Sequence, residues 1–305
     1  MSTFAHPLHR AYLIAFLVLL VLYVGCAGGT AERDPSNFRF GSQGLELRFS
    51  PGNPTVFYEG SDVSLLVEVY NRGTAPAYGE FFISGYDPSF MQMRVYPSHI
   101  ISMEGKDQFD PRGDMFQMVT VAADRVRLPR NRESFPQSIQ LTACYRYSTY
   151  ASSEVCVDPD PYNRRLSDKV CQLSAQNPGG QGHPIIISSV EPTVSQNDIR
   201  FQIRISNSGG GQVYDLRTPF GKCGIGLDQG DINYVYVGPV TLGGQALSCE
   251  PLNPVRMLSG TGTINCVCRN CVDPGLGAYK SLLEMELDYH YRQTLTRDIQ
   301  LRAVN

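Results

Sequence analysis

Asp62-Val-Ser-Leu-Leu-Val-Glu-Val-Tyr-Asn-Arg-Gly73 decides the fold of this chain, because the sequence contains a close copy of it. The copy, Asp198-Ile-Arg-Phe-Gln-Ile-Arg-Ile-Ser-Asn-Ser-Gly209, aligns with it without a gap. In both stretches apolar residues occupy every second position, which is the spacing of a strand with one face on a core. Each ends in Asn-x-Gly, whose residues tolerate positive φ. We therefore predict two equivalent strands, each followed by a turn.

A second pair of matching stretches lies further along the chain. Ile139-Gln-Leu-Thr-Ala-Cys-Tyr-Arg-Tyr147 aligns without a gap with Leu283-Glu-Met-Glu-Leu-Asp-Tyr-His-Tyr291, with the paired tyrosines in register. The offset is 136 residues for the first pair of stretches (207 minus 71) and 144 for this pair (291 minus 147). Two ordered matches at similar offsets predict a duplicated domain. The second copy carries a net insertion of eight residues (144 minus 136), in the region that holds most of the cysteines.

Short apolar runs separated by glycine and proline fill the rest of both halves, and no convincing amphipathic helix interrupts them. This pattern predicts an all-β chain of two tandem immunoglobulin-like antiparallel β-sandwiches behind an N-terminal hydrophobic helix. We place the first sandwich at residues 44–160, a linker at 161–183 and the second sandwich, with its cysteine-rich insertion, at 184–305. Each Tyr-x-Tyr strand is expected to belong to a hairpin, the first of which turns at Tyr150.

The amino terminus contains an uninterrupted apolar run that predicts export. Arg10 precedes this run and no Lys or Arg follows until Arg33, so residues 1–10 are expected to stay in the cytoplasm while the bulk is exported. Residues 11–27 are then a signal or anchor helix. Residues 28–43, rich in Gly, Ser, Asn and charge, form a tether.

Three fates of the apolar segment stay open. It is retained as a membrane anchor, cleaved beside the small residues around Cys26, or lipidated at Cys26, since Tyr23-Val-Gly-Cys26 resembles a lipobox. The protein is membrane-anchored and extracytoplasmic in the first and third cases, and secreted in the second. Arg10-Ala11 also resembles a prepilin cleavage site, which gives the alternative of a pilus-like filament subunit.

The strand motifs carry a family resemblance. The alternating run that opens on Asp62 and ends in Asn-x-Gly resembles the CARDB domains, immunoglobulin-like modules of bacterial and archaeal surfaces. Most of residues 40–305 is also similar to exported archaeal proteins, through Gly60-Ser-Asp62, Ser84-Gly-Tyr-Asp-Pro88, Ala143-Cys-Tyr-Arg-Tyr147 and Gly180-Gln-Gly182. The resemblance implies spacers, adhesive modules or assembly parts, and it offers no catalytic residue to carry over.

Eight cysteines follow Cys26, and an even number in an exported chain predicts disulfides. They are Cys144, Cys156, Cys171, Cys223, Cys249, Cys266, Cys268 and Cys271. A hairpin turning at Tyr150 would place Cys144 opposite Cys156, and the rival pair is Cys156 with Cys171. Cys249 is expected to join Cys266 or Cys268, and Cys271 to join Cys223 or Cys171.

The run Cys266-Val-Cys-Arg-Asn-Cys271 also permits a metal or redox function. Three thiolates this close, joined by Cys249 or Cys223, could ligate zinc or an iron–sulfur cluster. Cys268 and Cys271 form a Cys-x-x-Cys motif, although no βαβ context surrounds it. Because export favours oxidised cysteines, we predict disulfides there and no cofactor.

Other polar residues give weaker signals. The histidines show no catalytic or metal-ligand spacing; they are His6, His9, His99, His183 and His290. We expect His290 on a solvated strand face. Asp158 and Asp160, with Asn163, could offer oxygens to calcium, but Asp-Pro pairs are also ordinary strand ends. A net charge of -3 gives no basic face for nucleic acid.

These features predict a non-catalytic, membrane-tethered, extracytoplasmic binding or structural module of the cell surface. It would contact the membrane through residues 11–27. Through loops or strand edges it would contact surface proteins or further copies of itself. The alternatives are the filament subunit and a metal-binding or thiol-redox protein that uses Cys266, Cys268 and Cys271.

Overall fold

The computed structural model describes residues 38–162, 169–251 and 253–304. Within these residues the one helix is short, α2 (Phe220–Ile225), and the other elements are strands. The strands pair antiparallel, apart from the short β2 (Val56–Tyr58), which runs parallel to its partner. The predicted all-β class with immunoglobulin-like antiparallel sandwiches is confirmed. The predicted N-terminal helix lies outside the described residues.

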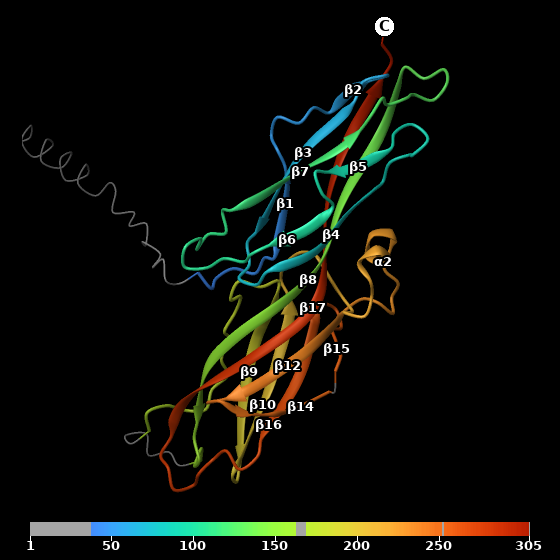
Figure 1. Cartoon of the computed structure of the whole chain (residues 1–305). Coiled ribbons are helices and arrows are strands. Elements are labelled where there is room, and N and C mark those ends of the chain that lie inside the picture. The colour runs from blue at the N-terminus through green and yellow to red at the C-terminus, as the bar shows by residue number, and fades with distance from the viewer. Residues whose placement is uncertain (1–37, 163–168, 252, 305) are drawn as a thin grey trace, which may run out of the picture. The chain divides into compact units, whose positions relative to one another are not determined.

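Two strands of 24 residues form the spine of the fold (Figure 1). They are β8 (Ser134–Val157) and β17 (Tyr279–Arg302), and they pair antiparallel along their whole length. The prediction of two hairpins is therefore wrong, because each of these segments forms one continuous strand without a turn. The stretch around Tyr150 contains Ser, Thr, Tyr and Ala but no Gly, Pro or Asn, so nothing in it imposes a turn.

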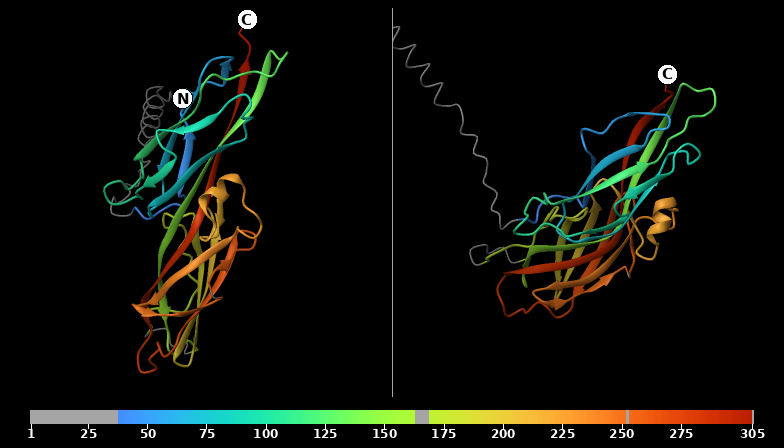
Figure 2. Two further views of the ribbon diagram at one scale, coloured as in Figure 1. Left: turned by 45° about the vertical axis from the view of Figure 1, so that its right-hand side comes forward. Right: turned by 45° about the horizontal axis from the view of Figure 1, so that its top comes forward.

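Three sheets are built around this spine (Figures 1 and 2). The first four-stranded sheet has the order β1 (Leu45–Phe49), β3 (Val63–Asn71), β7 (Phe116–Ala123) and β5 (Met93–Tyr96). The second has the order β14 (Ser248–Glu250), β16 (Thr261–Cys268), β10 (Asp198–Asn207) and β9 (Ile185–Ser195). The nine-stranded sheet has the path β13 (Gln245–Ala246), β12 (Tyr234–Leu242), β17, β8, β4 (Ala77–Ser84) and β6 (Ile100–Met103), with β2, β11 (Gln212–Tyr214) and β15 (Val255–Arg256) off this path.

The two copied strands, β3 and β10, place their alternating apolar residues in the core as predicted. In β3 every predicted core residue is at most 1% exposed: Val63, Leu65, Val67 and Val69. The same holds in β10 for Ile199, Phe201, Ile203 and Ile205. Burying these side chains removes apolar surface from water, which is the main favourable contribution to folding. The side chains between them, such as Leu66 in β3 and Gln202 in β10, face away from this core.

The duplicated halves are related by an approximate two-fold axis. Arg146 of β8 and His290 of β17 are equivalent in the duplication, being 144 residues apart, and they also face each other in the β8–β17 ladder. The axis therefore passes between these two residues. Tyr78 of β4 pairs with Arg146 as Tyr214 of β11 pairs with His290, in agreement with the same symmetry.

This symmetry makes the halves exchange strands. The far end of β17, Gln300–Arg302, belongs to the second copy, yet it pairs with β2 of the first copy. Residues Phe38–Asn305 accordingly form one compact unit. The division at residues 161–183 stays a prediction about the duplicated sequence, and the two copies share one continuous sheet.

The copied Asn and Tyr residues meet in the folded chain. Asn71 accepts hydrogen bonds from the Tyr147 hydroxyl (3.0 Å) and the Gly73 N–H (3.1 Å). In the second half Asn207 accepts from the Tyr291 hydroxyl at 2.8 Å. The alignment of the two stretches in each half thus reflects a direct contact, in which the turn after the first strand is tied to the spine.

Four buried tyrosines gather around the two-fold axis. They are Tyr145, Tyr147, Tyr289 and Tyr291, and neighbouring ring centroids lie 5.7–6.3 Å apart. Such tilted and edge-on ring pairs add about 0.5–1.5 kcal/mol each beyond simple burial. Gly73 lies against this cluster, and a Cβ there would come within 1.8 Å of the Tyr147 hydroxyl oxygen. The turn therefore needs glycine for space.

Candidate interaction surfaces

The eight described cysteines form four disulfides. The bonds join Cys144 to Cys223, Cys156 to Cys171, Cys249 to Cys266 and Cys268 to Cys271. The favoured hairpin bridge from Cys144 to Cys156 is wrong because β8 does not turn. Its rival, Cys156 with Cys171, is confirmed, as is Cys249 with Cys266. Neither predicted partner of Cys271 was correct.

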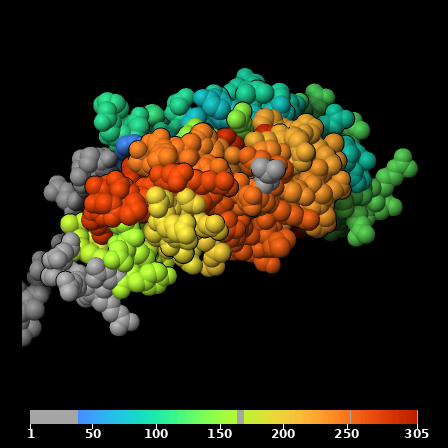
Figure 3. Space-filling model, turned by 90° about the horizontal axis from the view of Figure 1, so that it is seen from below, coloured from blue at the N-terminus to red at the C-terminus, as the bar shows by residue number. Residues whose placement is uncertain are grey.

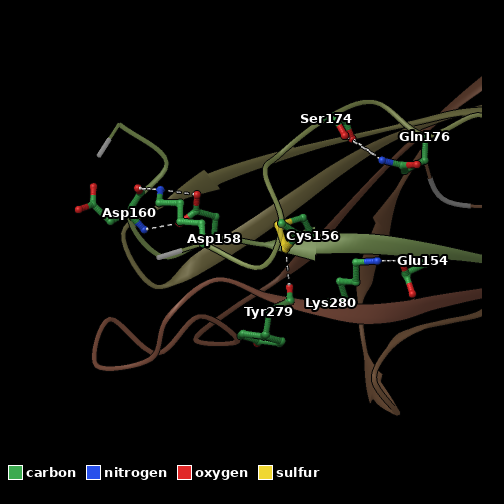
Figure 4. Close-up of a disulfide and its surroundings, with 10 residues drawn as sticks. Glu154, Cys156, Asp158, Asp160, Ser174, Gln176, Tyr279 and Lys280 are labelled. Atoms are coloured by element: carbon green, nitrogen blue, oxygen red, sulfur yellow. Dashed lines mark hydrogen bonds and ion pairs between the residues drawn. A yellow bond between two sulfur atoms is a disulfide. The ribbon is translucent and has the colours of Figure 1, made fainter. Parts of the chain in front are cut away.

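The Cys156–Cys171 disulfide lies where β8 ends beside the start of β17 (Figure 4). Beyond it, the buried carboxylate of Asp158 accepts a hydrogen bond from the Lys169 ammonium at 2.6 Å. A calcium ion would need these oxygens, and a lysine ammonium already occupies that position. Asn163, the third expected ligand, lies outside the described residues.

The four cysteines proposed as a metal site are all bonded in pairs. Zinc and iron–sulfur clusters require thiolates, so the alternative built on Cys249, Cys266, Cys268 and Cys271 would need both disulfides to be reduced. Within the described residues, no three His, Cys, Asp or Glu side chains are grouped as a metal ion requires.

Residues 215–233 of the second copy, between β11 and β12, pack against β8 and β4, and we call this segment the insertion. Its helix α2 carries Cys223, whose disulfide to Cys144 fixes it on β8, and a Cβ on Gly224 would strike the ring of Phe82 in β4. The insertion also covers His290, which is 8% exposed and lies 3.2 Å from the Thr218 carbonyl oxygen through Nδ1. The expectation of a solvated His290 is therefore wrong.

A second histidine, His183, is 1% exposed and lies against Tyr147 of the first copy. Its Nε2 lies 2.8 Å from the Thr74 hydroxyl, and its Nδ1 has no hydrogen-bond partner within the described residues. Burial lowers the pKa of His183 from 6.5 to about 3 and that of His290 from 6.5 to about 4. Both imidazoles are neutral packing groups at physiological pH.

We expect acid to destabilise the protein through these two histidines. The unfolded chain binds protons at both below pH 6.5, whereas the folded chain stays unprotonated down to about pH 4, so stability present above pH 6.5 is lost as pH falls. Each histidine contributes about 1.4 kcal/mol per pH unit in that window. Denaturant titrations at several pH values should show a shallower slope for His183→Gln or His290→Gln than for the unchanged protein. Equal slopes in all three proteins would contradict this assignment.

The outer face of the first small sheet is unusually apolar. Four of its outward side chains, which we call the apolar face, are well exposed: Leu66 (39%), Tyr96 (63%), Phe116 (51%) and Met118 (46%). In the second sheet the register places Gln202 where Leu66 stands, Thr261 for Phe116 and Thr263 for Met118. Polar residues therefore support the same strand pair, and the fold does not require the apolar ones. Apolar residues exposed beyond the needs of the fold mark an interaction surface.

The apolar face borders an open strand edge. β5 covers only Thr120–Ala123 of β7, and within the described residues no strand pairs with Phe116–Val119 on the side away from β3. This edge segment, Phe-Gln-Met-Val, contains no charge and no proline, the usual protections of an edge. Other edges are protected: β1 carries Glu46 and Arg48, and β9 carries Pro192.

A groove of about 630 Å³ lies on the outer side of the second small sheet. Its walls come from β10, β16 and the three-residue strand β14, which the Cys249–Cys266 disulfide attaches to β16. Figure 3 views this end of the chain from below, with the yellow β9–β10 region against orange-red residues of β16 and the loop after it. The two small sheets thus present different chemistry on equivalent faces.

The predicted membrane contact through residues 11–27 lies outside the described residues. The anchor at residues 11–27, the lipidation candidate Cys26 and the prepilin-like Arg10-Ala11 all lie outside them. Within the described residues no helix has the length and apolar character that crossing a membrane would take.

Comparisons with known proteins add little to this picture. No protein-family model matches the chain, and no curated protein matches its sequence. Among solved structures it is similar to the E. coli chaperone DraB, with 13% identity and a TM-score of 0.23 over 73% of this chain and 86% of that one. A second similar structure is a chain from the Salmonella enterica SafA pilin in complex with the SafB chaperone. The identity is again 13% and the TM-score 0.23, over 74% of this chain and 85% of that one. Likeness at this level carries no argument about what the protein does.

Proposed function

We propose that this protein is a non-catalytic, membrane-tethered, extracytoplasmic structural module that joins a second copy of itself through the open edge of β7. The single observation that carries the proposal is the coincidence of that edge with the apolar face on the same strand. An edge with free backbone groups accepts another strand, and apolar side chains beside it supply the burial that makes the pairing stable.

The charges around the edge support a second copy as the partner. Arg48 pairs with Glu68 at 2.6 Å, Arg94 with Asp124 at 2.7 Å, and Arg72 with both Glu46 (2.7 Å) and Asp114 (2.9 Å). The charged side chains around the edge therefore neutralise one another within one copy of the chain. A two-fold contact brings each patch against its own copy, so a neutral apolar patch is self-complementary where a charged one would repel.

The disulfides support the proposed location. Four disulfides in a chain of this size are typical of oxidising compartments and rare in the cytosol. The resemblance to CARDB surface domains is consistent with this location. Sequencing the mature amino terminus tests the tether: an intact end or a lipidated Cys26 supports it, a chain that begins after Cys26 makes the protein secreted, and a start at Tyr12 supports the filament alternative.

Sedimentation equilibrium of the purified full chain tests self-association. We expect a reversible dimer that Phe116→Thr with Met118→Thr abolishes, because these changes copy the second sheet and remove the apolar surface. Their effect on the free energy of unfolding should stay within about 0.5 kcal/mol, as for exposed positions generally. Gln117→Lys, which adds an inward-facing charge to the edge strand, should also weaken the dimer.

Leu282→Thr is the matched control, since Leu282 is 44% exposed on β17 away from this edge. It should leave the dimer intact. A chain that is monomeric at the highest soluble concentration would refute the proposal. So would a dimer that survives both Phe116→Thr with Met118→Thr and Gln117→Lys.

A further inference from the structure

We propose that the groove on the second small sheet binds an acidic polysaccharide, a polymer that carries carboxylate groups among many hydroxyls. This goes beyond the self-association proposed above and uses a different face. The sequence singled out the cysteine-bearing region as the place where the two copies diverge, and the groove is where that divergence reaches the surface.

Three arginines in and beside the groove have no ion-pair partner within the described residues. Arg200 and Arg269 line the groove, and Arg204 stands on the same outward face of β10, two residues beyond Gln202. All three are exposed. Guanidinium groups bind carboxylates in a two-pronged geometry that single-point cations do not match. The groove therefore offers sites for an oxyanion.

The first sandwich is an internal control for these arginines. The strand registers align Arg200 with Ser64, and they align Arg204 with Glu68, which is paired there with Arg48. The same registers align Arg269 with Asp124, since both follow the last residue of the strand next to β3 or β10. The shared fold is thus stable with a neutral or acidic residue at each position. Cations at all three positions of the second copy have no role that the fold explains.

The remaining lining of the groove favours a hydroxyl-rich ligand. Amide and hydroxyl side chains lie between the arginines, from Gln202, Asn265, Ser248 and Thr193. Such groups both donate and accept hydrogen bonds, as sugar hydroxyls do. The groove exposes apolar surface to a similar extent, although Phe201 is only 1% exposed and Val267 is partly buried. The C–H faces of sugar rings can pack against that surface while the ring hydroxyls bond to the polar side chains.

One acidic residue in the groove provides a variant that should strengthen binding instead of weakening it. Glu250, on β14, is exposed and lines the same groove as Arg200. A carboxylate at this position repels an anionic ligand that the arginines attract. Removing its charge should therefore tighten binding, whereas removing an arginine should weaken it.

The experiment measures binding of polygalacturonate to the purified full chain by calorimetry at fixed salt. We expect binding that Arg200→Ser and Arg269→Asp each weaken about tenfold or more, since each removes a hydrogen-bonded charge. Glu250→Gln should tighten binding about twofold to fivefold, the size of an exposed charge effect. Arg132→Ser, at an exposed arginine outside the groove, is the matched control and should change nothing.

Two further probes identify the ligand class. Neutral dextran should not bind, and polyglutamate should bind much more weakly than polygalacturonate because it lacks hydroxyls. Equal binding of polyglutamate would overturn the assignment to a polysaccharide, and no binding of polygalacturonate would overturn the site. Equal losses for Arg132→Ser and Arg200→Ser would show only non-specific attraction and would also overturn it. Phe116→Thr with Met118→Thr should leave polygalacturonate binding intact, so that failure of this proposal and failure of self-association are separable.

Discussion

Replacing Asn71 with alanine is expected to lower the free energy of unfolding by about 3–5 kcal/mol. Asn71 is 2% exposed and its side chain makes four hydrogen bonds, accepting from Tyr147 and Gly73 and donating to the carbonyl oxygens of Ala75 (2.8 Å) and Glu104 (3.1 Å). Alanine leaves the groups of Tyr147, Gly73 and Ala75 buried without a partner, whereas the carbonyl of exposed Glu104 can bond to water. Each buried unsatisfied group costs about 1–3 kcal/mol. Urea denaturation of the two proteins measures the difference.

Asn207→Ala is the control that the duplication provides. Asn207 makes the equivalent bonds to Tyr291 and Gly209, but it is only partly buried, so water can replace part of what is lost. We expect a loss of about 1–3 kcal/mol there. Tyr147→Phe, which removes one hydroxyl, should cost less than Asn71→Ala. A cost below 1 kcal/mol for Asn71→Ala would show that the turn is not tied to the spine in this way.

Removing the Cys144–Cys223 disulfide, by changing both residues to alanine, is expected to cost about 4–5 kcal/mol. The bond joins residues separated by 79 positions, and closing so long a loop removes much entropy from the unfolded chain. It also holds the insertion on β8, so His290 should become accessible to water when it is absent. Denaturant unfolding gives the cost, and the pH slope of stability reports whether His290 has become exposed.

Cys156→Ala with Cys171→Ala is the matched comparison, because those residues are separated by only 15 positions. On the same loop-entropy argument the expected cost is about 3 kcal/mol. The pH slope should not change, since this bond lies far along β8 from His290. Equal costs and equal slopes for the two double variants would contradict the proposed role of the insertion.

The sequence predicted the local structure well wherever neighbours along the chain decide it. Alternation placed the core residues of β3 and β10 correctly, and the duplicated Tyr-x-Tyr stretches correctly located the two halves of the spine. The predictions that failed concern features decided by a distant partner. Tyr150 continues in a strand because β17, more than a hundred residues later, pairs with it; Cys144 bonds to Cys223 because the insertion folds back over β8.

The candidate surfaces show the same limit. Nothing in the sequence around Phe116 and Met118 says that these residues face outward, because their period-two pattern also suits a core strand. The sequence around the exposed arginines likewise does not mark them as a binding site. Only the strand registers, which align Arg200 with Ser64, show that the second copy carries a cation where the first copy has none. A comparison of the two copies, strand by strand, would have given this signal from sequence if β7 and β16 had been recognised as equivalent.

The full pairing of β8 with β17 has a consequence for how the protein is made. Its closest pair, Val157 with Tyr279, is separated by 122 residues (279 minus 157), and its furthest, Ser134 with Arg302, by 168 (302 minus 134). Such non-local contacts slow folding, because a long stretch of chain must be ordered before they form. During synthesis the first half emerges with one side of β8 uncovered, and the sheet cannot be completed until β17 has been made. That waiting period is when aggregation is most favourable, so we expect efficient production to depend on a chaperone that covers the unpaired side of β8.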